Sequence, residues 1–198
     1  AEVRVARIFS DHMVLQRDQP IPVWGWADAG ESIKVTLGMA EATAIAGEDG
    51  TWTTSLPAQQ AGDPRTLTVA GKNTITLSDV LVGEVWLCSG QSNMAMRVWD
   101  SKNRDAEMKA ATFPSIRLFS QQNLLSHEPL PDTGASWQAC SPDTVGNFSA
   151  VGYFFGREIH REVGVPVGLI NASWGGTNIE AWMEESSLAG TPWGPAQV

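Results

Sequence analysis

The sequence predicts a mixed fold, with an antiparallel β-sandwich over residues 1–80 and part of a parallel α/β domain over residues 81–198. Short alternating runs separated by turn residues dominate the first part. The second part alternates buried strand-like runs with helical patterns, which is typical of a parallel sheet. Only two or three strands of that sheet are visible, and a sheet so small leaves apolar faces uncovered. We therefore expect a further segment to complete it.

The first part contains a series of strand-like runs with Gly and Asp clustered between them. The clearest is 32–37, whose strict alternation places Ile33, Val35 and Leu37 on one face. The strands predicted here are 22–26, 32–37, 51–56, 65–69 and 73–77. Strands at this spacing that are rich in Thr, Val and Trp indicate a small antiparallel sandwich.

From about residue 81 the pattern changes to strand, helix, strand and helix. An apolar strand over 80–88 leads into a helix that we expect to begin near Ser92, and a further strand is predicted at 115–119. The segment 120–147 contains three prolines and is expected to be irregular. A stretch of that length is usually functional or covers a neighbouring element.

A second helix is predicted to open at Phe148–Ser149 and to end at Gly164, because glycine is the common residue after a helix. Its apolar stripe consists of Gly152, Phe155, Ile159 and Val163. A buried strand follows at 165–171, and another helical pattern begins at Ile179. Since ligands bind beyond the carboxyl ends of parallel strands, we expect the site in the loops after these strands.

Composition excludes several classes of partner. The formal net charge of −9 argues against nucleic acid and against an anionic membrane surface. No apolar run approaches the ~20 residues that a membrane-spanning helix needs. Cys88 and Cys140 have no metal-ligand spacing with histidine, so we expect no metal and no cofactor, and the spacing leaves a disulfide between them open. The chain begins at Ala1 without an initiator methionine, which fits a mature exported protein and equally well a trimmed chain.

Nine tryptophans stand against one tyrosine. Exposed indoles can serve as stacking platforms for sugar rings. The simpler expectation is that most of these tryptophans pack in the core.

The junction between the 80–88 strand and Ser92 holds one hydroxyl at the edge of a sheet. Its residues, Gly90-Gln91-Ser92-Asn93-Met94, resemble the first block of the SGNH (GDSL-like) hydrolases, in the form found in sialate O-acetylesterases and related carbohydrate acetylesterases. Residues 174–182 match the second block of that family. Further family-like residues lie at 13–17 and 148–155. The resemblance covers nearly the whole chain and implies a three-layer SGNH hydrolase domain behind the sandwich.

The resemblance also implies roles for individual residues. Ser92 would be the nucleophile, and the backbone amides of Ser92 and Gly176 would donate hydrogen bonds to the oxyanion. The residues expected to contact the substrate or shape the loop are Gln91, Asn93, Gly175 and Thr177. Taken singly, Ser92 is better explained as a helix cap and the glycine pair as a tight turn, and it is their joint placement at the ends of two buried strands that favours the catalytic roles.

A serine nucleophile needs a general base, which the family supplies from an Asp-x-x-His block near the C-terminus. The family also supplies a third oxyanion donor, an asparagine, from a Gly-Glu-Ser-Asn-like block. Neither block occurs in these residues. The three histidines, His12, His127 and His160, lie at positions expected to be surface, loop and solvated helix. We therefore expect the base to come from a C-terminal segment or a second chain.

The function predicted from this resemblance is a serine esterase that removes O-acetyl groups from carbohydrate, such as sialic acid or xylan decorations, through an acetyl-enzyme. Such a protein would be exported to the periplasm or the extracellular space, or to the lysosome in a eukaryote. The alternative is a non-catalytic carbohydrate-binding module, or an inactive esterase fragment, in which Ser92 stays idle.

Overall fold

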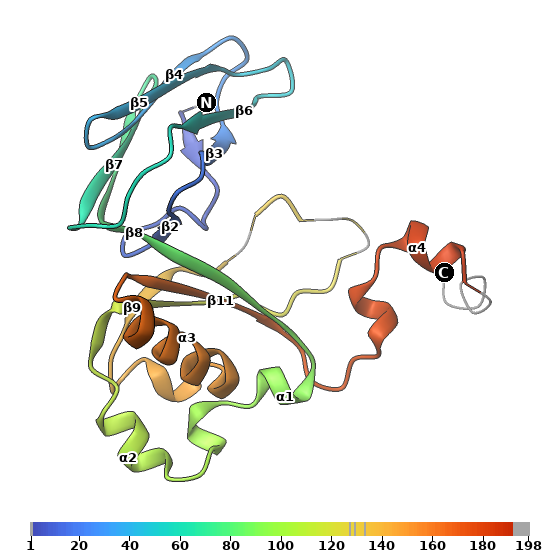
Figure 1. The fold of residues 1–198 in the computed structure, drawn as a ribbon. Coiled ribbons are helices and arrows are strands. Elements are labelled where there is room, and N and C mark those ends of the chain that lie inside the picture. The colour runs from blue at the N-terminus through green and yellow to red at the C-terminus, as the bar shows by residue number, and fades with distance from the viewer. Residues whose placement is uncertain (1, 127, 129, 133, 192–198) are drawn as a thin grey trace.

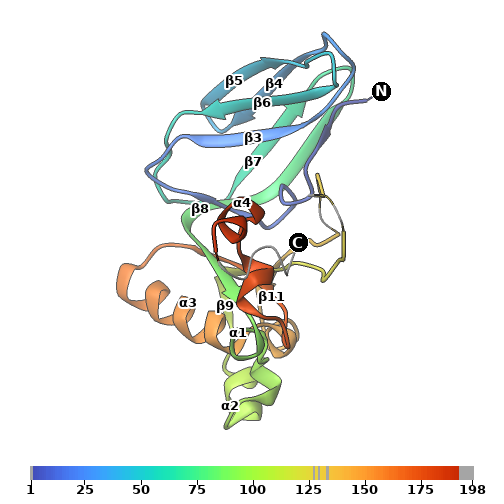
Figure 2. The same cartoon turned by 90° about the vertical axis from the view of Figure 1, so that its right-hand side faces the viewer.

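The computed structural model describes residues 2–126, 128, 130–132 and 134–191. Its strands form one sheet of three strands and one of eight. Figure 1 shows the N-terminal strands stacked above the later strands and helices. In Figure 2 these strands lie at one end of the molecule, and α1 (Ser92–Ala95) and α2 (Arg104–Lys109) lie at the other. The fold is therefore mixed, as predicted.

The N-terminal strands form two antiparallel layers that share one core. The first layer consists of β1 (Arg4–Val5), β3 (Ile21–Trp26) and β6 (Thr51–Leu56). The second consists of β4 (Ser32–Leu37), β5 (Ala40–Ile45), β7 (Arg65–Ala70) and the first part of β8 (Thr74–Gly90). Ile33, Val35 and Leu37 are fully buried, which confirms the face predicted from their alternation.

One strand, β8, belongs to both parts of the chain. Separate strands were expected at 73–77 and 80–88, but residues 74–90 form a single strand of 17 residues. It pairs with β7 over its first half and with β11 (Val167–Ser173) over its second, while β2 (Val14–Gln16) pairs beside its middle. Asp79 has a φ of 54°, and β7 shifts register opposite it, so β8 bends there without ending.

The later strands bring two carboxyl ends to one edge. The parallel order is β9 (Phe113–Ser120), β11 and β8, and Ser173 of β11 pairs with Gly90 of β8. The antiparallel strand β10 (Trp137–Cys140) pairs with β9. This strand interrupts a segment that was expected to be irregular throughout. It forms because both of its end residues are buried and β9 offers a free edge.

Helix α3 (Ala150–Val163) covers one face of the parallel strands, as Figure 1 shows. Its caps are Ser149 and Gly164, close to the predicted ends. The shorter helical segments are α4 (Glu185–Ala189) and the 3-10 turns η1 (Val98–Asp100), η2 (Val145–Asn147) and η3 (Ile179–Trp182). On the opposite face of the parallel strands Leu87 is 67% exposed. Among the described residues, a long helix therefore covers only one face of these strands.

The stripe predicted for α3 is wrong at Phe155 and at Val163, which are 40% and 45% exposed. The buried side of the helix instead carries Gly152, Tyr153 and Gly156. A Cβ at Gly156 would lie 2.6 Å from Leu169 Cδ1. Glycine therefore lets the helix approach the sheet most closely on this side, which turns Phe155 toward the edge.

The tryptophans divide between core and surface. Trp52 and Trp137 are buried, as expected for most of them. Four others are more than a third exposed, namely Trp24, Trp86, Trp99 and Trp182. The expectation of a mainly internal set is thus wrong for the described residues. Trp193 lies outside the described residues.

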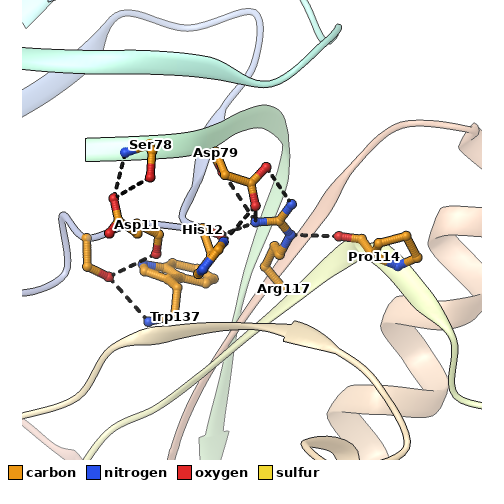
Figure 3. Close-up of polar contacts among 8 residues, drawn as sticks. Asp11, His12, Ser78, Asp79, Pro114, Arg117 and Trp137 are labelled. Carbon is orange, nitrogen blue, oxygen red and sulfur yellow. Dashed lines mark hydrogen bonds and ion pairs between the residues drawn. The ribbon is translucent and has the colours of Figure 1, made fainter. Parts of the chain in front are cut away.

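An ionic cluster around the buried side chain of Arg117 joins the N-terminal segment, β8 and β9 (Figure 3). The Arg117 side chain is 5% exposed, and its Nη1 lies 2.7 Å from Asp79 Oδ2. Arg117 also donates hydrogen bonds to the carbonyl oxygens of His12 at 3.0 Å and Pro114 at 2.7 Å. His12 Nδ1 lies 2.6 Å from Asp79 Oδ2. The Arg117 hydrogen bond is the largest cause that lowers the pKa of Asp79. Arg117, Asp79 and His12 are called the junction cluster below.

Candidate active site

The chain turns sharply between β8 and Ser92. Gly90 has a φ of 139°, a conformation that residues with a side chain rarely adopt. Gln91 then serves as the N-cap of the short helix α1, whose first residue is Ser92. The serine is exposed at the edge of the sheet. This placement matches the prediction that the strand presents one hydroxyl at its end.

The second predicted motif lies against the first. β11 ends beside β8, and the Trp174 amide donates a hydrogen bond to the Gly90 carbonyl at 2.9 Å. Two residues later, the Gly176 amide donates to Ser92 Oγ at 3.3 Å. Gly176 has a φ of 80°, which favours glycine. Residues 84 positions apart in the sequence therefore share one site.

Gln91 holds the serine in its present orientation. Its Oε1 accepts a hydrogen bond from Ser92 Oγ at 2.8 Å and another from the Ser92 amide at 3.0 Å. The Gln91 side-chain oxygen thus already accepts the hydrogen bond of the Ser92 N–H, the group that would donate to an oxyanion. Another acceptor can reach that N–H only after the Gln91 side chain moves away.

The other predicted site residues shape the loops. A Cβ at Gly175 would lie 3.5 Å from Ser92 Oγ, so the second loop passes at van der Waals distance from the serine hydroxyl. Thr177 Oγ1 donates to the Trp174 carbonyl at 2.9 Å and closes the turn that contains both glycines. Asn93 lines a shallow depression of about 500 Å³ together with Ser92.

The start of α3 anchors the serine loop, a role that was not predicted. Ser149 Oγ accepts a hydrogen bond from the Gly152 amide at 3.1 Å and donates to Met94 Sδ at 3.4 Å. The Ala150 amide also donates to the Met96 carbonyl at 2.8 Å. A serine before an apolar helix is recognisable in the sequence as an N-cap, but its contact with the loop that carries Ser92 is not.

The two described histidines lie far from Ser92. His12 pairs with Asp79, and the strand from Asp79 to Gly90 has a length of roughly 35 Å at 3.3 Å per residue. His160 Nδ1 lies 2.7 Å from the Val165 carbonyl oxygen, at the opposite end of β11 from the site. His127 lies outside the described residues. The described partners of Ser92 Oγ are Gln91 and Gly176, and neither is a general base.

Neither of the two cysteines offers a reactive thiolate. Cys88 and Cys140 are buried, and both are free thiols. Burial raises the pKa of Cys88, and it raises the pKa of Cys140 to about 12. Both therefore remain protonated near neutral pH.

No group of three or more His, Cys, Asp or Glu residues suited to a metal ion occurs in the part of the chain that the structure describes. None of the helices described is both long and apolar enough to cross a bilayer.

Comparisons with known proteins agree with these motifs. A family model described as carbohydrate esterase, sialic acid-specific acetylesterase, matches residues 82–191. Sialate O-acetylesterase of Rattus norvegicus is 35% identical over 207 residues, which cover 93% of this chain and 38% of that protein. The Homo sapiens sialate O-acetylesterase is 34% identical, over 93% of this chain and 39% of that protein. The chain thus spans about two-fifths of the length of these relatives.

A solved structure resembles nearly the whole chain. A carbohydrate acetylesterase from Xanthomonas citri superposes with a TM-score of 0.92 at 39% sequence identity. The match covers 96% of this chain and 44% of that one. It includes the N-terminal strands as well as the segment that carries Ser92 and Gly176.

Proposed function

The chain belongs to the carbohydrate esterase family of sialic acid-specific acetylesterases, and we propose that it carries the nucleophile of a serine esterase that removes O-acetyl groups from carbohydrate. The observation that carries this proposal is the 3.3 Å hydrogen bond from the Gly176 amide to Ser92 Oγ. It joins the two family motifs at the carboxyl ends of two parallel strands.

In the proposed reaction Ser92 Oγ attacks the acetyl carbonyl and gives up its proton to a base. The carbonyl oxygen becomes an oxyanion, which the amides of Ser92 and Gly176 stabilise. Removal of one such donor commonly costs about 10²–10³ in rate. The intermediate expels the sugar hydroxyl, which takes the proton, and leaves an acetyl-enzyme. Water then attacks the acetyl group and releases acetate.

Gln91 has to release Ser92 before this attack. Its Oε1 holds both the hydroxyl and the amide, so the arriving acetyl oxygen replaces it on the Ser92 N–H. We propose that Gln91 and Asn93 then contact the substrate on one side of the serine. Gly175 and Thr177 shape the loop on the other side.

The proposed base is a histidine with its orienting aspartate, supplied by an Asp-x-x-His segment of a C-terminal portion or a second chain. The greater length of the curated relatives and the distance of His12 and His160 from Ser92 support this division. We also propose that residues 1–80 form a β-sandwich domain and that 81–198 form the N-terminal part of a three-layer SGNH hydrolase domain. Two hydrophobic cores support that division, because the first lies mostly within residues 1–80, joined by Val82, Phe119 and Trp137, and the second lies wholly within the later part. Export from the cell, and sialic acid or xylan as the acetylated substrate, remain parts of this proposal.

Hydrolysis of p-nitrophenyl acetate tests the assignment. We expect activity when the chain is combined with a C-terminal segment carrying Asp-x-x-His, and little activity from the chain alone. Ser92→Ala in the combined protein should lower kcat by about 10⁴-fold or more. Ser89→Ala, an exposed serine on the same strand, is the matched control and should leave activity unchanged. Full activity in Ser92→Ala would rule out the nucleophile. Glycan binding by a combined protein without esterase activity would favour the non-catalytic alternative.

A further inference from the structure

The outer face of the three-stranded N-terminal layer carries an exposed tryptophan. Alternate residues of a strand point to opposite faces of its sheet, so Ile21 and Val23 of β3 enter the core while Pro22 and Trp24 point outward. Outward positions on such a layer are usually polar. Trp24 is nevertheless 37% exposed. Figure 2 views this layer from outside, with β3 and β6 in front of β7. The sandwich core therefore does not account for an indole at this position.

Hydroxyl groups lie beside the exposed indole. β3 pairs with β6 in a register that places Thr53 opposite Trp24 and Ser55 opposite Pro22. Directly opposite residues of an antiparallel pair share one face, with Cβ atoms about 4.5–5.5 Å apart. Thr53 and Ser55 are both exposed, and a hydroxyl can donate and accept hydrogen bonds. An apolar ring and polar groups thus stand next to each other on one face of the layer.

Contacts with the neighbouring segments hold the aromatic side chains in place. Phe9 packs nearly perpendicular to Trp24, with the ring centroids 4.6 Å apart. Two residues further along β3, the Arg4 guanidinium lies over the Trp26 ring, 5.1 Å from its centroid. Residues two apart in a strand are separated by about 7 Å. The face therefore offers two preformed planar surfaces, the indole of Trp24 and the guanidinium of Arg4, and a preformed surface loses less conformational entropy on binding.

The size of this face is too small for a protein partner. The outward residues described above, called the β3 face below, are Arg4, Pro22, Trp24, Trp26, Thr53 and Ser55. A stable protein interface takes about 20–30 residues from each partner. The net charge of −9 argues against nucleic acid. A sugar ring has an apolar C–H face and hydroxyl groups at its edge, and the β3 face offers a partner to each of these in adjacent positions.

We propose that the β3 face is a glycan-binding site, separate from the candidate active site. A glycan chain stacks on Trp24 and accepts or donates hydrogen bonds at Arg4, Thr53 and Ser55. In Figure 2 β3 lies toward the opposite end of the molecule from α1, so binding there does not need Ser92. The inference goes beyond the proposed function, because it gives the N-terminal strands a ligand of their own.

Titration calorimetry with soluble oligosaccharides tests this proposal. The probes are xylohexaose, cellohexaose and chitohexaose, and the protein is the whole chain with Ser92→Ala, so that ester hydrolysis contributes no heat. We expect at least one probe to bind, because stacking tolerates different sugar rings. Trp24→Ala should weaken that binding about tenfold, and Trp24→Phe, which keeps a ring against Phe9, should retain part of the affinity. Failure of all three probes to bind would overturn the proposal.

Trp99→Ala is the matched control and should leave the affinity unchanged. Trp99 is 44% exposed and packs against Arg104 of α2, at the other end of the molecule. Because Trp24→Ala also loses the contact with Phe9, Thr53→Ala provides a second test at an exposed hydroxyl and should weaken binding about threefold.

Unchanged affinity in Trp24→Ala, in a chain that circular dichroism shows to be folded, would refute the site. Dimers in sedimentation that Trp24→Ala dissociates would assign the β3 face to a second copy of the chain and would also refute it. Neither readout depends on hydrolysis of p-nitrophenyl acetate. The glycan-binding site and the proposed esterase function can therefore fail separately.

Discussion

Replacing Arg117 with methionine should lower the free energy of unfolding by about 3 kcal/mol at neutral pH. Methionine keeps much of the side-chain volume but removes the guanidinium, whose side chain is 5% exposed. Asp79 then loses its principal partner, and the carbonyl oxygens of His12 and Pro114 lose a donor. Breaking a buried ion pair from one side typically costs about 3–5 kcal/mol. The lower end applies because the Asp79 side chain is 34% exposed.

The effect should also depend on pH in one direction. Arg117 lowers the pKa of Asp79 in the folded protein from the ordinary 3.8. The paired carboxylate therefore stabilises the fold at pH values above about 4, and this contribution is lost as the pH falls through the lowered pKa. The difference in unfolding free energy between the natural chain and Arg117→Met should shrink as the solution is acidified below that value.

Urea unfolding followed by circular dichroism measures both quantities. Lys34→Met is the matched control, because Lys34 is 51% exposed and pairs with Glu41 on the surface. It should change the unfolding free energy by less than about 1 kcal/mol. A loss below about 1 kcal/mol for Arg117→Met at neutral pH, or a difference that grows in acid, would refute this account of the junction cluster.

Three further predictions concern the hydrophobic core between α3 and the parallel strands, which includes Cys88, Tyr153 and Leu169. Ser149→Ala removes the cap of α3 and the contact with Met94, so it should cost about 1 kcal/mol in thermal unfolding, and an unchanged melting temperature would contradict the anchoring role. Gly156→Ala should lower the free energy of unfolding by about 1–3 kcal/mol, because the added methyl meets Leu169 Cδ1 at 2.6 Å. This loss outweighs the helix preference of alanine over glycine, which is about 1 kcal/mol. Val151→Ala, on the exposed side of the same helix, is its control, and stabilisation by Gly156→Ala would show that the helix shifts freely. Cys88 and Cys140 should resist dithionitrobenzoate at pH 8 in the folded chain, since burial raises their pKa values. Both should react in denaturant, and rapid labelling of the folded chain would contradict their burial.

The sequence predicts best those strands whose buried face is encoded locally. The strands at Ser32–Leu37 and Thr51–Leu56 have the bounds expected from their patterns. β5 and β10 were missed for a different reason. Ala40–Ile45 has a weak apolar face, and Trp137–Cys140 is a short strand that depends on pairing with β9. Pairing between distant segments leaves no periodic signal in either of them.

The candidate site was likewise predictable from the sequence only in part. The meeting of Ser92 and Gly176 follows from two buried strands that run in parallel and end at the same edge, which the sequence pattern already indicates. The contact of Gln91 with both polar groups of Ser92 depends on a side-chain rotamer, and no pattern encodes it. The hydrogen bonds that Thr177 Oγ1 makes with the Trp174 carbonyl and the Trp182 indole depend likewise on how the loop after β11 folds back.

The position of Ser92 depends on residues at both ends of β8. The junction cluster fixes the strand at Asp79, where it bends, and seven paired positions with β11 fix it from Glu84 to Gly90. No turn interrupts the strand between these two supports. A shift of the N-terminal layers would therefore be carried along the strand to the serine loop, because a paired strand transmits displacement along its axis. The N-terminal strands thus form part of the support that positions Ser92, and their stability and the geometry of the candidate site are physically linked.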